Sequence, residues 1–513
     1  MNNQQLPLFP PRSVEELIKD LQLLTAEIQE LYCHDETPWI IGYSGGKDST
    51  CILQLIWNAI AQLPEAKRHK KIYVITNDTL VENPIVAYWV SQSIEKINDS
   101  ALRQNMPITA HLTQPVVKNT FWVCLIGKGY PAPRRNFRWC TERMKIQPAE
   151  QFIRETVRLH GETILVLGTR KAESTNRARN MKRREEKDRI RERLNYNSRM
   201  PNSYVYTPIE DWRTDEVWLY LMQWQNPWGV DNNDLFAMYR GATADNECPL
   251  VVDTNTPSCG DSRFGCWVCT LVNKDKSMEA MIHNDEEKEW LQPLLDLRDE
   301  LDVDNDHDKR DFRRIYGKVE LYERNVDGNT TIHNIPGPYL KEWREYWLKK
   351  VLLAQKSLQE NAPPQFKDYP LISQAELTEI RRIWLEEKHE FEDTLPTIYH
   401  DITGLEFHDP DNEGQHRLLG TEEWRTLEEL CDGDAMHLEL MARLLDTERQ
   451  FFTKTRRVGI YQALEKCFAT SSRSKEEAIA NAHYLREVKG AAARGDVQAL
   501  QQQLEWGQMK FKK

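Results

Sequence analysis

Short apolar runs alternate with longer amphipathic stretches through the first half of the chain. The apolar runs are rich in β-branched and aromatic residues, and they are PWIIGYS (38–44), KIYVITN (71–77), PITAHLT (107–113) and TILVLGT (163–169). Strands that alternate with helices predict an α/β fold, a doubly wound parallel sheet with helices on both faces. Ser13 and Glu16 form a capping-box pattern, which predicts that a leading helix begins there.

The second half of the chain has a different pattern. After residue 280 the apolar positions mostly follow helical spacing, and NAPPQFKDYP interrupts them near 362–370. At 513 residues the chain is also too long for one comfortable core. The sequence therefore predicts four parts: an N-terminal helix (1–36), the α/β domain (37–224), a loop-rich cysteine-bearing region (225–280) and a mainly helical C-terminal region (281–513).

Charge is unevenly distributed along the chain. The net charge of −12 argues against a generally basic nucleic-acid-binding protein. Residues 170–199 nevertheless hold 12 Lys or Arg against 5 Asp or Glu, and residues 118–145 hold 7 against 1. These zones either guide a polyanion to a site in the α/β half or form solvated helix faces, as expected for RARNMKRREEKDRIRER. No apolar run is long enough for a transmembrane helix and no signal-peptide pattern is present, so we expect a soluble, cytoplasmic protein with reduced thiols.

The stretch IGYSGGKDST (41–50) follows the first predicted strand and precedes an amphipathic helix. Gly45 and Gly46 allow a ligand to approach the backbone, and the N–H groups at a helix start favour negative charge. A Walker A loop is excluded, because Gly42 is one residue too close to Gly46 and Asp48 stands where a hydroxyl is required. The turn therefore predicts a phosphate site of another type, with Lys47 and Asp48 facing solvent.

Polar residues end two of the other predicted strands. Thr76, Asn77 and Asp78 end the second strand, and Gly168 and Arg170 follow the fourth. Ligands of open α/β sheets bind outside the carboxyl ends of the strands, so we expect these residues and the turn to converge on one nucleotide. The guanidinium of Arg170 is suited to phosphate, whereas Arg177 is either a second phosphate partner or a surface ion-pair residue.

Three cysteines cluster just past the middle of the chain and a fourth lies upstream. Cys259, Cys266 and Cys269 stand in SCGDSRFGCWVC, and Cys140 stands in FRWCTERMKI. Four such thiolates are suited to a [4Fe–4S] cluster or to Zn²⁺, and Cys248 competes with Cys140 for the fourth position. The other five cysteines are expected to be small apolar core residues, and they are Cys33, Cys51, Cys124, Cys431 and Cys467.

Several of these motifs together resemble the DndC family, the iron–sulfur ATP pyrophosphatases of bacterial DNA phosphorothioation. The motifs are SGGKDST, WVCLIGKGYPAPRRNFRWCTERMKI, GTRKAESTNRA, PIEDW and CPLVVDTNTPSCGDSRFGCWVC, within about residues 40–275. The resemblance implies an adenine nucleotide α-hydrolase-like fold, cleavage of ATP to AMP and pyrophosphate, and replacement of a DNA phosphate oxygen by sulfur. It implies a [4Fe–4S] cluster, ATP and Mg²⁺ as cofactors. DNA, a cysteine desulfurase of the DndA or IscS type, DndD and DndE are the implied partners.

The resemblance also implies roles for individual residues. Lys47, Asp48 and Arg170 would be catalytic, with Mg²⁺ bound through Asp48, and Cys140 is favoured over Cys248 as the fourth cluster ligand with Cys259, Cys266 and Cys269. The nucleotide would be held by Ser44, Gly45, Gly46, Lys47, Asp48 and Ser49 at the pyrophosphate, by Thr76, Asn77 and Asp78 at adenine and ribose, and by Gly168, Arg170 and Arg177 over the phosphates.

Other functions stay open on the sequence. Related assimilatory reductases of the PAPS and APS type carry a Cys-Cys pair and a terminal nucleophilic cysteine. Here Trp139 precedes Cys140, and the last 46 residues contain no cysteine, which argues against sulfate reduction. A tRNA-thiolating enzyme and a non-catalytic nucleotide-sensing scaffold are the remaining alternatives. A DNA groove is expected along Arg134, Arg135 and Arg138 with the interleaved Tyr130, Phe137 and Trp139, unless a partner protein carries the DNA.

Overall fold

The computed structural model describes residues 12–499 and 501, apart from 136, 174, 243–263, 304, 327–328, 410–420, 453–455, 470 and 472–473. The chain divides into two compact units. Unit 1 comprises Met1–Phe121, Pro133–Asp302 and Ser357–Leu371, and unit 2 comprises Trp122–Ala132, Val303–Lys356 and Ile372–Lys513. Among the described helices, none is both long and apolar enough to cross a bilayer.

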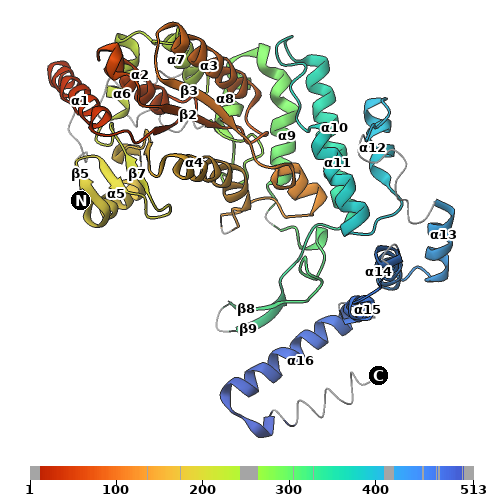
Figure 1. The fold of residues 1–513 in the computed structure, drawn as a ribbon. Coiled ribbons are helices and arrows are strands. Elements are labelled where there is room, and N and C mark those ends of the chain that lie inside the picture. The colour runs from red at the N-terminus through yellow and green to blue at the C-terminus, as the bar shows by residue number, and fades with distance from the viewer. Residues whose placement is uncertain are drawn as a thin grey trace, which may run out of the picture. The chain divides into compact units, whose positions relative to one another are not determined.

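A seven-stranded sheet forms the centre of unit 1 (Figure 1). Its order is β3-β2-β1-β4-β7-β6-β5, and the strands from β3 to β7 pair in parallel. The chain runs outward from β1 to β3 and then returns to β4 on the other side of β1. The predicted doubly wound sheet is confirmed, and its switch point lies between β1 and β4. The parallel strands are β1 (Trp39–Gly42), β2 (Ile72–Asn77), β3 (Ile108–Thr113), β4 (Thr163–Val166) and β7 (Ser203–Tyr206).

Helices cover both faces of this sheet, because side chains alternate between the faces along each strand. Trp39 and Ile41 of β1 belong to the larger core, whereas Ile40 points to the opposite face and packs in a core with Ile153. The larger core is covered by α1 (Val14–His34), α2 (Lys47–Ala61), α3 (Pro84–Arg103), α6 (Thr214–Gln223) and α7 (Asn232–Gly241), and the opposite face by α4 (Gln147–His160). The Ser13–Glu16 capping box of α1 is present as predicted.

The basic segment after the fourth strand differs from its predicted form. The helix α5 (Thr175–Asp188) ends at Asp188, and the next residues form β5 (Arg189–Arg191) and β6 (Leu194–Tyr196). These strands extend the sheet antiparallel to β7. The expectation of one continuous helix through RIRER was therefore wrong, because pairing with a sheet edge outweighs local helix propensity.

Unit 1 also contains α8 (Lys276–Asn284) and α9 (Gln292–Leu301). Unit 2 is mainly helical, as predicted, with α10 (Lys341–Asn361), α11 (Gln374–Arg382), α12 (Thr394–Thr403), α13 (Thr421–Leu430), α14 (Ala435–Phe452), α15 (Ile460–Ala469) and α16 (Lys475–Arg494). The final turns of α10 cluster with unit 1. A hairpin of β8 (Leu321–Val326) and β9 (Asn329–Asn334) was not predicted.

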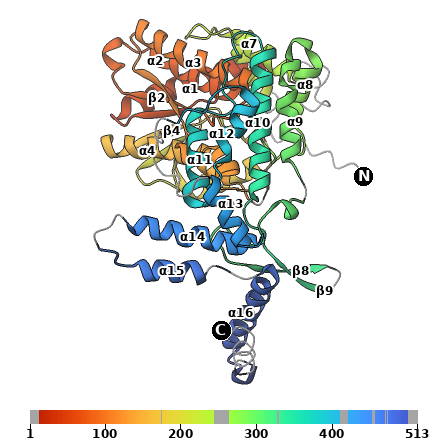
Figure 2. The same cartoon turned by 90° about the vertical axis from the view of Figure 1, so that its right-hand side faces the viewer.

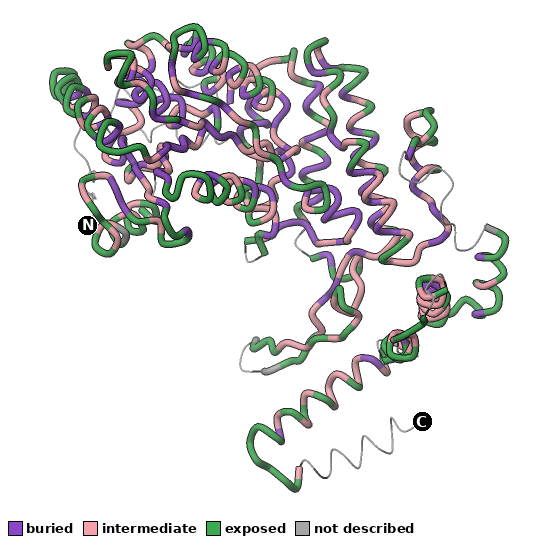
Figure 3. The backbone as a smooth tube through the Cα atoms, in the orientation of Figure 1, coloured by how far each residue is buried: buried purple, intermediate pink, exposed green. Residues whose placement is uncertain are grey.

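The helices of unit 2 differ in how much they bury. In α10, Trp347, Leu348 and Val351 are at most 1% exposed, whereas α16 buries Ala478 and Ala491 and its other residues are intermediate or exposed (Figure 3). The helices α14 and α15 pack side by side (Figure 2). The well-packed core of unit 2 therefore lies around α10 and α11, where Leu377 and Ile380 are also buried.

Candidate active site

The phosphate turn lies between β1 and α2, as the sequence predicts. Gly46 is the N-cap residue of α2, and Gly45 has a φ of +72°, in the left-handed region. A Cβ at Gly45 would lie 2.5 Å from Val90 Cγ2, and the indole of Trp89 donates to the Gly45 carbonyl at 3.1 Å. The glycine is required both for its backbone conformation and because α3 packs against the turn.

The two serines of the turn hold its shape. The backbone N–H of Ser44 donates to the hydroxyl oxygen of Ser49 at 3.2 Å, and that hydroxyl donates to the Gly46 carbonyl at 2.9 Å. These bonds close the turn over the first residues of α2. The N–H groups of Lys47 and Asp48 stand in the first turn of the helix, where they lack intrahelical acceptors.

Asp48 lies between two cations. Its Oδ1 accepts from Arg170 Nε at 2.7 Å, and its Oδ2 lies 3.3 Å from Lys47 Nζ. The guanidinium of Arg170 is 1% exposed and also donates to the Trp212 carbonyl at 3.2 Å and to Thr214 Oγ1 at 3.3 Å. The side chains of Lys47 and Asp48 are only 15% and 22% exposed, so the expectation that both face solvent was wrong.

Burial lowers the pKa of Lys47; the carboxylate of Asp48 opposes this shift, and the charge of Arg170 adds to it. The ring of Tyr239 lies 5.1 Å from Lys47 Nζ, and its hydroxyl accepts from the Lys47 backbone N–H at 3.4 Å. Phosphate oxygens arriving at the turn would therefore meet a positive centre made of two side chains and a helix N-terminus.

The end of β4 contacts the turn directly. A Cβ on Gly168 would lie 2.8 Å from the Asp48 carbonyl oxygen, so a larger residue there would displace the turn. Arg170 follows two residues later, and its backbone N–H donates to Glu173 Oε1 at 3.1 Å. Glu173 also pairs with Arg177, whose side chain is 48% exposed. Gly168 and Arg170 thus meet the turn, and Arg177 lies at the surface beside them.

The side chains at the end of β2 form hydrogen bonds with other groups of the protein. Thr76 is buried and its hydroxyl donates to the Tyr43 carbonyl at 2.7 Å. Asn77 donates through Nδ2 to the Lys145 carbonyl at 2.8 Å and accepts from the Thr113 hydroxyl. Asp78 accepts from the Leu80 backbone N–H at 2.8 Å and from Gln114 Nε2 at 2.9 Å. These contacts order the strand end, and through Lys145 they connect it to the segment that follows Cys140.

Three of the predicted cysteine ligands line one cavity of about 150 Å³. Cys140 directly precedes the helical turn Thr141–Ile146, and in the later segment the backbone N–H of Cys269 donates to the Cys266 carbonyl at 3.1 Å. Phe121, Pro133, Met144, Lys145, Val268 and Leu271 complete most of the lining. The structure therefore brings together two segments that are more than a hundred residues apart in the sequence.

Polar side chains lie close to the Cys266 thiol. Cys266 Sγ lies 3.4 Å from the Thr79 hydroxyl and 3.7 Å from Glu82 Oε1, and Glu82 pairs with Lys145 at 3.7 Å. Burial raises the pKa of Cys266 to about 12 and also raises the pKa of Cys140. Neutral thiols are therefore favoured in this apolar cavity, and a bound cation would have to supply the charge that stabilises thiolates.

Cys140, Cys266 and Cys269 are of the residue type that binds an iron–sulfur cluster or a thiolate-bound metal, and they line one small cavity. Cys248 and Cys259 lie outside the described residues. Within the described part of the chain, no group of three or more Cys, His, Asp or Glu side chains is close enough to form a metal site. No disulfide joins the cysteines that the structure describes, and Cys33 is exposed, which corrects its expected place in the core.

The residues expected to line a DNA groove are only partly accessible. Trp139 is 6% exposed and stacks on Phe121 with ring centroids 5.5 Å apart, so it is not free to stack on a base. Phe137 is 46% exposed, and Arg135 and Arg138 are exposed beside it. Tyr130 belongs to unit 2.

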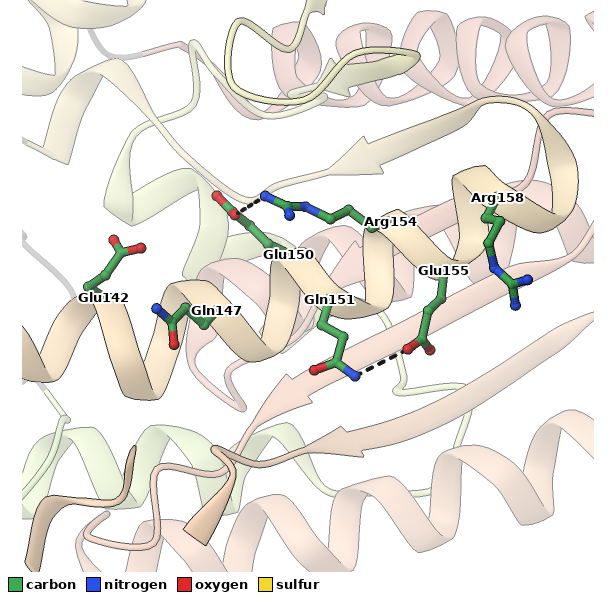
Figure 4. Close-up of a pocket in the computed structure, with 7 residues that line it drawn as sticks. All are labelled: Glu142, Gln147, Glu150, Gln151, Arg154, Glu155 and Arg158. Carbon is green, nitrogen blue, oxygen red and sulfur yellow. Dashed lines mark hydrogen bonds and ion pairs between the residues drawn. The ribbon is translucent and has the colours of Figure 1, made fainter. Parts of the chain in front are cut away.

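A larger cavity, of about 530 Å³, lies along the outer face of α4 (Figure 4). It is lined by Glu142, Gln147, Glu150, Gln151, Arg154, Glu155 and Arg158, which include the Arg154–Glu150 and Gln151–Glu155 pairs. These long side chains belong to one helical stretch and include none of the turn or the cysteines. The smaller, cysteine-lined cavity is the one that adjoins the end of β2.

Sequence reasoning missed Tyr239, Glu82 and Lys145, whereas Thr79 belongs to a strand end that was expected to lie near the nucleotide. Tyr239 stands 192 positions from Lys47, so no local pattern indicated that the two are in contact. Thr79 and Glu82 follow the predicted end of β2 directly, and that position was the available indication that they lie near a site.

Part of the chain is similar to a known protein domain. Residues 38–271 match the model of the phosphoadenosine phosphosulfate reductase domain. An uncharacterised protein of Methanocaldococcus jannaschii is 26% identical over 204 residues, which are 39% of this chain and 35% of that protein. The chain thus spans about a third of the length of this curated relative.

Solved structures with a similar fold include two fungal enzymes. Phosphoadenylyl-sulfate reductase from Candida auris, in a phosphate complex, has 13% identity and a TM-score of 0.26, covering 42% of this chain and 88% of that chain. FMN adenylyltransferase from Candida glabrata, with FAD and inorganic pyrophosphate, has 12% identity and a TM-score of 0.26, covering 48% and 73%. The family match over residues 38–271, which include the turn, the strand ends and the three cysteines of the cavity, shows that this part of the chain is similar to the phosphoadenosine phosphosulfate reductase domain, a nucleotide-binding domain of enzymes.

Proposed function

We propose that this protein is an ATP pyrophosphatase and sulfurtransferase of the DndC type, which inserts sulfur into the DNA backbone. The observation that carries the proposal is the Asp48 carboxylate held between Lys47 and the buried Arg170 at a Ser-Gly-Gly turn. This arrangement presents fixed positive charge at a helix N-terminus, in the same unit as a cavity lined by three cysteines.

The first step is adenylation. A non-bridging oxygen of a DNA phosphodiester attacks the α-phosphorus of ATP, the bond from that phosphorus to the β-bridging oxygen breaks, and pyrophosphate leaves. The N–H groups of the turn, Lys47 and Arg170 bind the negative charge that develops on the departing pyrophosphate. Asp48 keeps the two cations in place, because its two oxygens each contact one of them.

The second step replaces oxygen by sulfur. A sulfide attacks the adenylated phosphorus, and AMP leaves with the former phosphate oxygen, so no net oxidation is required. Cys140, Cys266 and Cys269 would hold a [4Fe–4S] cluster, with a fourth ligand from the residues that the structure does not describe. Such a cluster supplies a sulfide or electron-transfer chemistry when bound.

Mg²⁺ at Asp48 is not supported by the same geometry. Both carboxylate oxygens already face cations, at 2.7 Å and 3.3 Å, and a divalent cation there would be repelled by Lys47 and Arg170. We therefore assign no step to Mg²⁺ held by Asp48 and expect Mg²⁺ to arrive bound to the nucleotide phosphates.

DNA, a cysteine desulfurase of the DndA or IscS type, DndD and DndE are the proposed partners. The exposed basic residues near the site support a polyanionic substrate, and they include Arg135, Arg138, Arg179, Lys182 and Arg183. The apolar lining of the cysteine cavity would exclude water from a reactive sulfur.

The decisive experiment measures pyrophosphate and AMP formed from ATP by anaerobic protein with duplex DNA and sulfide. We expect Lys47→Met to lower turnover by about 10²-fold or more. The control is Lys182→Met, which removes the same charge from an exposed position of α5 and should leave turnover unchanged. Phosphorothioate linkages in the digested DNA identify the product.

Other products would identify the alternatives. Sulfite formed from phosphoadenylyl sulfate would indicate a reductase, thiolated tRNA would indicate a tRNA-modifying enzyme, and absence of pyrophosphate from any mixture would indicate a scaffold. Iron content and visible absorbance of anaerobic protein test the cluster. Cys266→Ser should lose both, and Cys33→Ser, at an exposed thiol, should retain both.

A further inference from the structure

Tyr239 lies between the phosphate turn and the segment that carries two of the cysteines. It belongs to α7 and is 8% exposed. On one side its hydroxyl accepts from the Lys47 backbone N–H at 3.4 Å, and a Cβ on Gly46 would lie 3.0 Å from that hydroxyl. The tyrosine thus contacts the part of the turn that a phosphate would occupy.

On its other side Tyr239 contacts Phe264. The two ring centroids lie 4.8 Å apart and the rings meet edge to face, at 84°. Phe264 is two residues before Cys266, and the backbone N–H of Trp267 donates to the Val81 carbonyl at 3.0 Å. A movement of the Phe264 ring would therefore move backbone close to the cysteine cavity. This segment is also bonded, through Trp267, to Val81, which follows the end of β2.

Phosphate binding would disturb the first of these contacts. At 3.4 Å the bond from Lys47 to Tyr239 is long, and a phosphate oxygen is a charged and therefore stronger acceptor for the same N–H. The hydroxyl then has to turn and donate to the phosphate or move away from it. Since the ring is packed against Trp218 at 5.2 Å as well as Phe264, a moving hydroxyl shifts a packed ring rather than a free one.

We infer that Tyr239 is a positioning residue that transmits occupation of the phosphate turn to the cysteine cavity, through its hydroxyl at Lys47 and its ring at Phe264. The inference rests on the proposed function, because it requires a phosphate ligand at the turn. The contact would couple ATP binding at the turn to the arrangement of the cysteine cavity, so that the cavity changes when a nucleotide is bound. Tyr239 would exist in two arrangements, one bonded to the Lys47 N–H and one displaced from it. A phosphate ligand changes their populations only by binding one arrangement more tightly than the other.

The test uses fluorine NMR of the full chain with 4-fluorophenylalanine in place of Phe264, titrated with inorganic pyrophosphate. We expect the resonance to shift on binding in the wild-type background and to lose that shift in Tyr239→Phe, which keeps the ring. The control label replaces Phe152, which packs on the opposite face of the sheet and should not respond. Calorimetry reports pyrophosphate binding separately for each protein.

The outcomes separate this inference from the proposed function. If pyrophosphate binds but the Phe264 label does not respond, or responds equally in Tyr239→Phe, the inference is overturned and the phosphate site stands. If pyrophosphate does not bind to the wild type, both fail. Hydrogen exchange at the Trp267 amide is the second measurement: pyrophosphate should change its rate in the wild type and leave it unchanged in Phe264→Leu.

Discussion

Replacing Asp48 by asparagine tests the central ion pair of the site. Asparagine keeps the shape of the side chain and removes its charge. Arg170 would then be left 1% exposed with neutral acceptors at Trp212 and Thr214, which accept hydrogen bonds but do not balance a charge. We therefore expect Asp48→Asn to lower the stability of unit 1 as well as activity, contrary to the solvent-facing position that the sequence suggests.

The size of the effect follows from burial. Removing one partner of a buried ion pair costs about 3–5 kcal/mol, because the other charge is left uncompensated. The Asp48 side chain is 22% exposed, so water replaces part of the lost interaction, and we expect a loss of about 2–3 kcal/mol. Asp215→Asn is the matched control. Asp215 pairs with Arg213 at 3.1 Å with both side chains more exposed, and its loss should cost about 1 kcal/mol or less.

The assay is urea unfolding followed by tryptophan fluorescence, with Asp48→Asn, Arg170→Met and the double variant forming a cycle. Each single change should destabilise the protein. The double variant should be more stable than the sum predicts, by about 1–3 kcal/mol, because the buried Arg170 charge that Asp48 balances is also removed. Lys47 loses its carboxylate partner in Asp48→Asn and in the double variant alike, so its contribution cancels in the cycle. Additive effects, or an unchanged midpoint in Asp48→Asn, would refute the reasoning.

Three further predictions concern the turn, its lysine and the core of unit 2. Gly168→Ala should abolish pyrophosphate binding measured by calorimetry, because its Cβ would lie 2.8 Å from the Asp48 carbonyl, whereas Gly265→Ala meets no atom and should bind normally. Pyrophosphate affinity should weaken as pH rises through a value below 10.5, because burial lowers the pKa of Lys47 and the neutral amine binds phosphate poorly. Lys47→Arg should bind pyrophosphate without this pH dependence, because the guanidinium stays charged. A wild-type affinity that does not change with pH would contradict the assignment. Burial lowers the pKa of Lys388 from 10.5 to about 8, so the protonated amine destabilises the folded state below that pH, and stability should rise as pH increases toward 10.5. Lys388→Met should remove this rise and stabilise unit 2 at neutral pH by about 2–3 kcal/mol, as urea midpoints across the pH range would show.

The sequence by itself determined the local elements of this protein. Short apolar runs rich in β-branched residues placed four of the parallel strands, β1 to β4, and the Ser13–Glu16 pattern placed the start of α1. The Ser-Gly-Gly turn also followed, because its glycines are needed at the turn itself. Such features depend on residues that are close in the chain, and their hydrogen bonds and φ angles are set by those neighbours.

The tertiary structure decided which of these elements meet. Asp48 and Arg170 are 122 positions apart, and Lys47 and Tyr239 are 192 apart, so each contact depends on the order of the strands rather than on local pattern. The same reason explains strands that the sequence did not predict. The β5–β6 strands and the β8–β9 hairpin form by pairing across turns, and pairing partners override weak local preferences. Burial of Arg170 and Trp139 is likewise decided by packing. The residue type alone does not indicate whether a charged or aromatic side chain faces a ligand or the core.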